Sequence, residues 1–253
     1  MIRTFSRLYP VNLDECVTPP GGFETFDAFF TRSLRDGARR WPEDADAIAS
    51  PCDGTLSQAG RIRGGQMLQA KARRFTAAEL LADERQAESF RDGHFITVYL
   101  APGDYHRVHM PFGGRLVAET RVPGRLFSVS EATGHAIDRL YARNERMVAR
   151  FDTAFGPAAV VMVAAMLVAG IESAWDPEGA KRPGRGVSRR AFEPPPALAR
   201  GAELGRFHWG STVIVLTPAS APAWRDDLAP GRRMRLGEPL TGTGNPPARS
   251  TGP

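Results

Sequence analysis

The stretch Gly205–Pro218, GRFHWGSTVIVLTP, decides how the rest of the chain is interpreted. Polar and turn-forming residues lead up to Gly210-Ser211, and the β-branched apolar run Val213–Leu216 follows them. An apolar run of this kind, bounded by turn residues, predicts a strand that is buried on both faces. We therefore expect the fold to be organised around a central strand that starts near Ser211.

The position of Ser211 also has a chemical consequence. Gly210 has no Cβ, so an attacking group can come close to its carbonyl carbon. With a general base nearby, the Ser211 hydroxyl could attack that carbonyl and convert the backbone amide to an ester. The same two residues are equally typical of an ordinary turn that leads into a strand. The pair alone does not choose between these interpretations.

Length and composition limit the class of protein. The chain has 253 residues, of which 42% are hydrophobic and 24% charged, as in an ordinary globular protein with a buried core. Two cysteines, Cys16 and Cys52, are too few for a disulfide framework, and no histidines accompany them at zinc-ligand spacing. We therefore expect a reducing compartment and no metal site.

The charge of the chain favours anionic partners. The net charge is +5, and only two of the 33 basic residues are lysines, Lys71 and Lys181. Arginine binds phosphate through two parallel hydrogen bonds and stays charged. An anionic membrane or a phosphorylated small molecule therefore fits. Nucleic acid is not expected, because no recognition motif accompanies the charge.

No segment has the pattern of a secretory signal or of a membrane-spanning helix. Residues 1–13 lack an apolar core. The longest apolar run, Ala158–Ile171, is too short to cross a bilayer and is expected to form a buried strand or a core helix. The protein is thus expected to be soluble or to rest on a membrane without crossing it.

The N-terminal region contains one amphipathic pattern. Residues 1–22 end in a Pro/Gly-rich run and are expected to be a flexible lead-in. From Phe23 to Leu34, apolar residues recur at helical spacing, with Thr25 as a candidate N-cap and arginines after them. Such a helix would pack its phenylalanines on the domain or lie on an anionic membrane.

Three further residues are candidates for acid–base chemistry. Asp53 precedes Gly54, and an Asp-Gly pair is the usual pair of a hairpin turn. His106 and His109 follow a predicted strand over Phe95–Leu100, and an imidazole near its reference pKa can transfer a proton. The alternatives are a turn-shaping aspartate and two structural histidines. Combined with a serine, these residue types suggest a Ser-His-Asp hydrolase.

The remaining pattern is one of short strands separated by turns, which predicts a single α+β, mainly β domain. A helix is expected near residues 77–87, and a basic Pro/Gly-rich loop over residues 176–200. The predicted organisation is a lead-in with a basic helix over residues 1–45, a catalytic β-rich domain over residues 46–240 and a disordered tail over residues 241–253.

Motifs along the whole chain together resemble one family. The chain resembles the pyruvoyl-dependent, prokaryotic-type phosphatidylserine decarboxylases from about Phe23 to Leu240. The matching segments are FDAFFTRSLRD (26–36), SPCDGTLS (50–57), LQAK (68–71), YLAPGDYHRVHMP (99–111), VPGRLFSV (122–129), ARNER (142–146), FDTAFGP (151–157) and GRFHWGSTV (205–213). In two respects the chain departs from the family: Trp209 replaces the usual leucine, and the N-terminal amphipathic stretch is short.

The resemblance implies an enzyme that processes itself. Asp53, His109 and Ser211 would form a triad in which His109 takes the serine proton and Asp53 holds its tautomer. Ser211 would attack Gly210, the ester would eliminate, and hydrolysis would leave a pyruvoyl group as the covalent cofactor. The products would be two chains, 1–210 and 211–253, that stay folded together.

The resemblance also implies the reaction, the partners and the architecture. The pyruvoyl group would form a Schiff base with the amine of phosphatidylserine and accept the electron pair released with carbon dioxide, which gives phosphatidylethanolamine. His106 would protonate the carbanion or orient the carboxylate. The family further implies an antiparallel β-sandwich or barrel-like core with peripheral N-terminal helices, a homodimer, and peripheral binding to the cytoplasmic face of the cell membrane.

One feature of the sequence supports a self-made carbonyl. Pyridoxal phosphate, the common electron sink of amine decarboxylases, needs a lysine. Lys181 lies in the basic loop, and no phosphate-binding motif is evident near Lys71.

Three alternatives remain open from the sequence. A soluble pyruvoyl-dependent decarboxylase of a free amino acid would carry the same motifs. A hydrolase using Asp53, His109 and Ser211 would remain one uncut chain. A lipoyl or biotinyl carrier domain would need a lysine at a hairpin tip, and the chain offers no convincing one.

Overall fold

The computed structural model describes residues 1–70, 73–166, 170–176, 186–208 and 210–242, and all structural statements concern these residues. Lys71, Lys181 and Trp209 lie outside them. So do residues 177–185 of the expected loop and residues 243–253 of the expected tail.

The central strand of the molecule is β13 (Ser211–Thr217), as its β-branched sequence predicts. All seven of its residues are buried. It pairs antiparallel with β4 (His94–Leu100) on one side and β8 (Gly156–Ala164) on the other. The predicted strand over 95–100 is thus confirmed, and the long apolar run supplies a buried strand rather than a helix or a membrane span.

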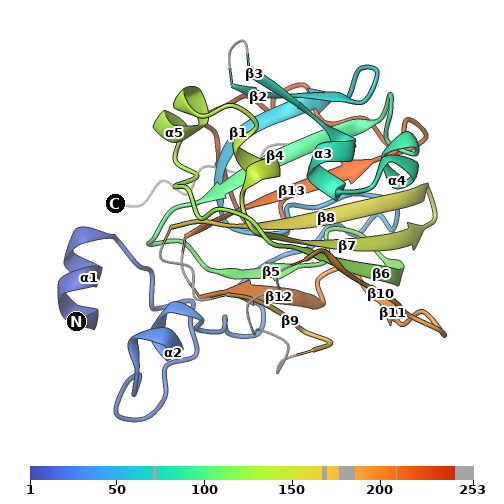
Figure 1. Cartoon of the computed structure of the whole chain (residues 1–253). Coiled ribbons are helices and arrows are strands. Elements are labelled where there is room, and N and C mark those ends of the chain that lie inside the picture. The colour runs from blue at the N-terminus through green and yellow to red at the C-terminus, as the bar shows by residue number, and fades with distance from the viewer. Residues whose placement is uncertain (71–72, 167–169, 177–185, 209, 243–253) are drawn as a thin grey trace.

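A large antiparallel sheet surrounds this strand (Figure 1). Eight of its nine described strands follow the order β10-β6-β7-β8-β13-β4-β1-β14. The ninth, β11, lies off this path and pairs with β6. The remaining members are β1 (Gly54–Arg61), β6 (Gly114–Val122), β7 (Arg146–Thr153), β10 (Ser188–Ala191), β11 (Ala197–Leu198) and β14 (Arg233–Met234).

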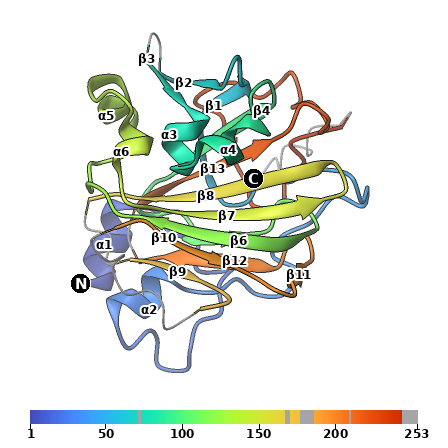
Figure 2. The ribbon, with the colours of Figure 1, turned by 45° about the vertical axis from the view of Figure 1, so that its right-hand side comes forward.

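A second, three-stranded sheet packs against the large one. It has the order β5-β12-β9 and consists of β5 (Arg107–His109), β12 (Glu203–Phe207) and β9 (Ile171–Ser173). At Gly205 of β12, a Cβ would lie 3.3 Å from Met162 Sδ of β8 and 2.3 Å from the carbonyl oxygen of Glu172, so only glycine fits between the strands. The two layers confirm the predicted mainly β, sandwich-like fold (Figure 2).

The helices are short and lie outside the sheets (Figures 1 and 2). They are α1 (Ile2–Leu8), α2 (Phe26–Phe30), α3 (Ala77–Leu81), α4 (Glu84–Glu88), α5 (Glu131–Ala136) and α6 (Leu140–Arg143). A hairpin of β2 (Gln66–Ala70) and β3 (Arg73–Thr76) precedes α3. No described helix has the length and apolar character needed to span a bilayer.

The N-terminal helix differs from its prediction. The Thr25 side chain caps α2 by accepting a hydrogen bond from the Ala28 N–H, as expected. However, the helix ends at Phe30, because the following segment is extended and Leu34 forms a bridge with Cys16. The arginines after residue 31 therefore do not belong to a helix. Helix α1 lies in the segment 1–22, which has no obvious helical pattern.

The helix expected over residues 77–87 is in fact two helices, α3 and α4. Ala82 between them adopts a left-handed conformation (φ 52°), which ends α3. The Asp83 side chain then accepts a hydrogen bond from the Gln86 N–H and starts α4. The apolar pattern runs across this break, so it does not reveal it.

Candidate active site

Ser211 begins β13 and lies opposite Leu100 of β4 and Ala164 of β8. Its side chain is wholly buried, and its Oγ has no hydrogen-bond partner among the described residues. Leaving a buried hydroxyl unpaired costs about 1–3 kcal/mol, so such a group calls for an explanation.

Three threonines on β4 and β13, namely Thr97, Thr212 and Thr217, share this unpaired state. Ser211 differs from them because it is the first residue of its strand and directly follows a glycine. Among the described residues, and leaving out its two chain neighbours, no heavy atom lies within 4 Å of a Cβ built on Gly210. No other described segment therefore covers Gly210 on that side.

The side chain of Ser211 faces the three-stranded sheet. Directly opposed residues of antiparallel strands project to the same face, so Ser211 shares its face with Ala164. Met162 lies on this face too, because side chains alternate along a strand, and Met162 approaches Gly205 of β12. Ser211 thus points toward the layer that carries both candidate histidines.

His106 immediately precedes β5 and is wholly buried. Its Nδ1 lies 2.9 Å from the carbonyl oxygen of Asp104, and because a carbonyl only accepts, Nδ1 carries the proton. The lone pair is therefore on Nε2, which is buried and has no partner among the described residues. Burial lowers the pKa of His106 to about 3, which keeps the imidazole neutral.

Helix α2 and His106 bind the residues that precede the Gly210–Ser211 bond. The Phe207 N–H donates to the His106 carbonyl oxygen over 3.0 Å. His208 Nδ1 lies 2.7 Å from a carboxylate oxygen of Asp27 in α2. The rings of Phe30 and His106 have centroids 4.0 Å apart. The segment before the bond is therefore held by α2, by His106 and, through His208 Nε2 at 3.3 Å from a carboxylate oxygen of Glu172, by β9.

His109 ends β5 and is half-buried. Its Nδ1 donates to the Gly201 carbonyl oxygen over 2.8 Å, so its Nε2 carries the lone pair and accepts from the Tyr105 hydroxyl at 3.1 Å. Burial raises the pKa of Tyr105 to about 12, which keeps that hydroxyl a donor. Burial also lowers the pKa of His109, whereas the Gly201 hydrogen bond and the charges of Glu203 and Asp53 act to raise it.

Asp53 lies in a bend just before β1 rather than in a hairpin turn, because Gly54 is already paired with Met234. This corrects the interpretation of the Asp-Gly pair. Both carboxylate oxygens of Asp53 accept from Arg39, at 2.6 and 3.4 Å, and one of them also accepts from the Leu236 N–H at 2.7 Å.

The structure brings Asp53 and His109 into one neighbourhood without a hydrogen bond between them. The His109 N–H donates to the Pro51 carbonyl oxygen over 2.8 Å, and the charge of Asp53 acts on the pKa of His109. Within the described part of the chain, no hydrogen bond joins Asp53, His109 and Ser211 to one another. Gly201 is the residue that holds the tautomer of His109.

Four residues that contact the candidate site are not among the residues predicted for it from the sequence: Arg39, Tyr105, Gly201 and Leu236. Tyr105 stands within the segment YLAPGDYHRVHMP, so its position was available as a signal. Gly201 and Leu236 act through backbone groups, which leave no mark in a side-chain pattern. A cavity of about 280 Å³ opens beside His109 and Tyr105, and Arg35, Arg39 and Arg107 contribute to its lining.

Comparison with known proteins gives consistent matches. The family model described as phosphatidylserine decarboxylase matches residues 26–242. Three similar proteins are each named phosphatidylserine decarboxylase proenzyme. The protein of Stenotrophomonas maltophilia is 46% identical over 242 residues, 95% of this chain and 86% of its own length. That of Methylococcus capsulatus is 48% identical, over 94% of this chain and 83% of its own length. That of Azotobacter vinelandii is 46% identical, over 95% of this chain and 86% of its own length.

Proposed function

The chain belongs to the phosphatidylserine decarboxylase family, and from this premise we propose that it converts phosphatidylserine to phosphatidylethanolamine and carbon dioxide after cutting itself between Gly210 and Ser211. The family match spans residues 26–242 and so includes all of the candidate site residues. Relatives named proenzyme support the self-cleavage.

The observation that carries the proposal is the state of Ser211. A serine that becomes a pyruvoyl group needs a hydroxyl that no other group has claimed, next to a carbonyl that can be approached. Ser211 Oγ is buried without a partner among the described residues, and no other described segment lies within 4 Å of the Cβ position of Gly210. Ser211 therefore fits as the origin of the group.

The chemistry of the cut can be written from these two residues. Ser211 Oγ attacks the Gly210 carbonyl carbon and gives its proton to a base; the C–N bond breaks, and the nitrogen takes up a proton as the amine. Removal of the Cα proton of Ser211 then expels the Gly210 carboxylate and leaves a dehydroalanine. Water hydrolyses its imine tautomer, releases ammonia and leaves a ketone.

We assign His109 as the base in this sequence. It is a neutral imidazole with its lone pair on Nε2, and the negative charge of Asp53 favours its protonated form. His106 is the weaker candidate, because a pKa of about 3 makes it a poor proton acceptor near neutral pH. For His109 to reach Ser211, its hydrogen bond with the Tyr105 hydroxyl has to open.

In the decarboxylation, the pyruvoyl carbonyl supplies the sink for the electron pair released with carbon dioxide. The chain's own residues bind and orient the substrate. The cavity beside His109 is lined by arginines, which suit the phosphate and carboxylate of the lipid headgroup. The unpartnered Nε2 of His106 is available to accept a hydrogen bond and so to orient the substrate or to hand on its proton.

Peripheral binding to the cytoplasmic face of an anionic membrane belongs to the same proposal. In α1 and beside it, Met1 and Leu8 are 88% and 70% exposed, and Arg3 and Arg7 lie on the same short helix. Exposed apolar side chains flanked by cations are the combination that binds such surfaces. The homodimer expected from the family is proposed on the resemblance alone.

The test uses three full-length proteins: the natural chain, Ser211→Ala and Thr212→Val. Thr212 is the matched control, because its buried hydroxyl is also unpartnered and valine keeps its shape. Under denaturing electrophoresis, we expect two fragments for the natural chain and for T212V, and one uncut chain for S211A. Vesicles of phosphatidylserine should yield phosphatidylethanolamine only with the two cleaved proteins.

The outcomes separate the alternatives. Cleavage of S211A would exclude Ser211 as the nucleophile. Turnover of free serine but not of lipid would favour the soluble decarboxylase, and an uncut natural chain with esterase activity would favour the hydrolase.

A further inference from the structure

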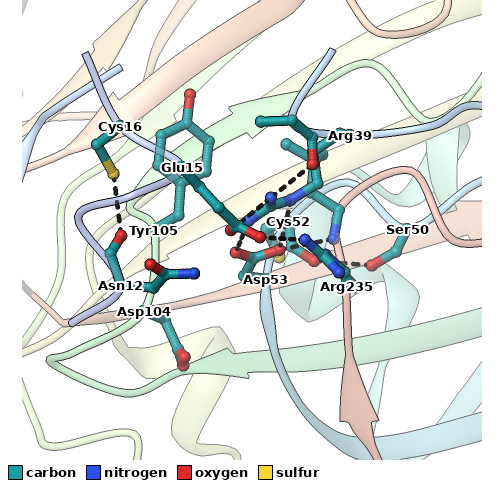
Figure 3. Close-up of polar contacts among 12 residues, drawn as sticks. Asn12, Glu15, Cys16, Arg39, Ser50, Cys52, Asp53, Asp104, Tyr105 and Arg235 are labelled. Atoms are coloured by element: carbon teal, nitrogen blue, oxygen red, sulfur yellow. Dashed lines mark hydrogen bonds and ion pairs between the residues drawn. The ribbon is translucent and has the colours of Figure 1, made fainter. Parts of the chain in front are cut away.

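Four charged side chains, Glu15, Arg39, Asp53 and Arg235, form a cluster in which Arg39 pairs with both carboxylates (Figure 3). Arg39 Nη2 and Nε donate to the two carboxylate oxygens of Asp53 over 2.6 and 3.4 Å. Its Nη1 donates to Glu15 Oε2 over 2.7 Å and to the Ala38 carbonyl oxygen over 2.9 Å. The Arg39 guanidinium thus binds the carboxylates of both Glu15 and Asp53, and it forms two hydrogen bonds with Asp53.

Within this cluster, Arg39 is the side chain most protected from water. The Arg39 side chain is 7% exposed, against 16% for Asp53 and 26% for Glu15. Burial by itself lowers the pKa of Arg39, but the hydrogen bonds and charges of Asp53 and Glu15 outweigh that effect and the pKa is raised. The guanidinium is therefore permanently charged and fixed in orientation.

The cluster also connects the two polypeptides that the proposed cut would produce. Each carboxylate is bound by Arg39 and by one group from beyond Ser211. Asp53 accepts from the Leu236 N–H, and Glu15 pairs with Arg235. After cleavage, Arg39, Glu15 and Asp53 belong to one fragment and residues 235–236 to the other. The location of Asp53 thus depends on contacts from both.

We propose that Arg39 is the positioning residue for Asp53 in self-cleavage. The inference rests on the proposed function and deepens it. Asp53 has no hydrogen bond to His109, whose Nδ1 is held by Gly201 instead. Asp53 can therefore favour the protonated imidazole only through space, and that effect depends on where its charge is held. The Arg39 fork sets that location.

The experiment measures the rate constant of self-cleavage in the full chain carrying Arg39→Ala or Arg39→Lys. We expect R39A to cleave about 100-fold more slowly, the loss typical of a misplaced group. R39K should retain a rate between R39A and the natural chain, because lysine restores the charge but not the fork. Guanidinium added to R39A should restore part of the rate.

Arg225→Ala is the matched control. The Arg225 side chain is 5% exposed and holds Asp227 with two bonds of 2.9 and 2.7 Å, as Arg39 holds Asp53. R225A should lower the melting temperature and leave the cleavage rate near that of the natural chain. Glu15→Gln should change the rate of self-cleavage much less than R39A, because both hydrogen bonds from Arg39 to Asp53 remain.

Two results would overturn the inference: R39A cleaves at the natural rate, or its slowing is matched by R225A at an equal loss of melting temperature. If R39A does not fold, R39K decides, and a natural rate in R39K rejects the need for the fork. A natural chain that never cleaves would instead count against the proposed function itself.

Discussion

The surroundings of Ser211 and of Asp53 differ in how their polar atoms are satisfied. Ser211 Oγ at the start of β13 and His106 Nε2 just before β5 are buried and have no partner among the described residues. At the start of β1, both oxygens of Asp53 are bound by Arg39 and the Leu236 N–H. An unpaired buried group lowers stability by about 1–3 kcal/mol, whereas a paired one fixes geometry. This contrast fits the proposed roles, in which Ser211 and His106 react and Asp53 supplies a charge at a fixed position.

The largest effect is expected from substituting the two histidines. His109→Gln should slow self-cleavage by about 100-fold or more, because the base is lost. His106→Gln should leave cleavage near the natural rate and reduce the yield of phosphatidylethanolamine. Intact mass measured over time, together with lipid analysis, separates the two effects. If H106Q blocks cleavage and H109Q does not, the roles of the two residues are reversed.

The second effect concerns stability and pH. The pKa of His106 falls from 6.5 to about 3 on folding, so between these values the unfolded chain binds a proton that the folded chain excludes. The stability linked to His106 is therefore complete above pH 6.5 and declines as the pH falls toward 3, by up to about 1.4 kcal/mol per pH unit.

Urea unfolding of S211A and of the double variant S211A/H106Q, both of which should stay uncleaved, measures this contribution. The slope of the unfolding free energy against pH should be steeper in the protein that keeps His106. The difference should be up to about 1.4 kcal/mol per pH unit, which corresponds to one proton bound by His106 in the unfolded state. Equal slopes for the two proteins between pH 6.5 and 3 would show that His106 is not held neutral by burial.

A smaller effect concerns Tyr105. Tyr105→Phe removes the donor that occupies Nε2 of His109 and leaves the ring in place. We expect cleavage to become faster by a few-fold, because one hydrogen bond worth about 1 kcal/mol no longer has to open. Slower cleavage in Y105F would mean that the hydroxyl assists His109 instead of occupying it.

The smallest effect is expected from substituting buried threonines whose hydroxyls, unlike that of Ser211, have no proposed role. Thr97→Val and Thr217→Val replace buried unpartnered hydroxyls by methyl groups of similar shape. Each should raise the free energy of unfolding by about 1 kcal/mol in urea and leave cleavage unchanged. A loss of stability would show that these hydroxyls do find partners in solution.

The parts of the fold that were predictable are those fixed by continuous apolar runs. Strands β13, β4 and β8 are buried on both faces, so each contains a continuous run of mostly apolar residues that stands out in the sequence. The end of α3 was not predictable, because Ala82 adopts a left-handed conformation that alanine rarely takes. The extended segment after Phe30 keeps an apolar spacing that resembles a helix.

The side chains that are proposed to perform the chemistry could be named from the sequence. Ser211, His106, His109 and Asp53 all belong to motifs that the sequence displays. The partners of these residues were not predictable, because they are backbone groups such as the Gly201 carbonyl or a distant arginine such as Arg39. These contacts exist only once the sheets bring the segments together.

The central claim is that the bond before Ser211 breaks and that Ser211 becomes a ketone. Intact mass spectrometry of the purified natural chain tests this most directly. The account predicts two polypeptides, residues 1–210 and 211–253, with the smaller one lighter by one ammonia than a fragment that begins with serine. A single unbroken chain of 253 residues that still releases carbon dioxide from phosphatidylserine would contradict it.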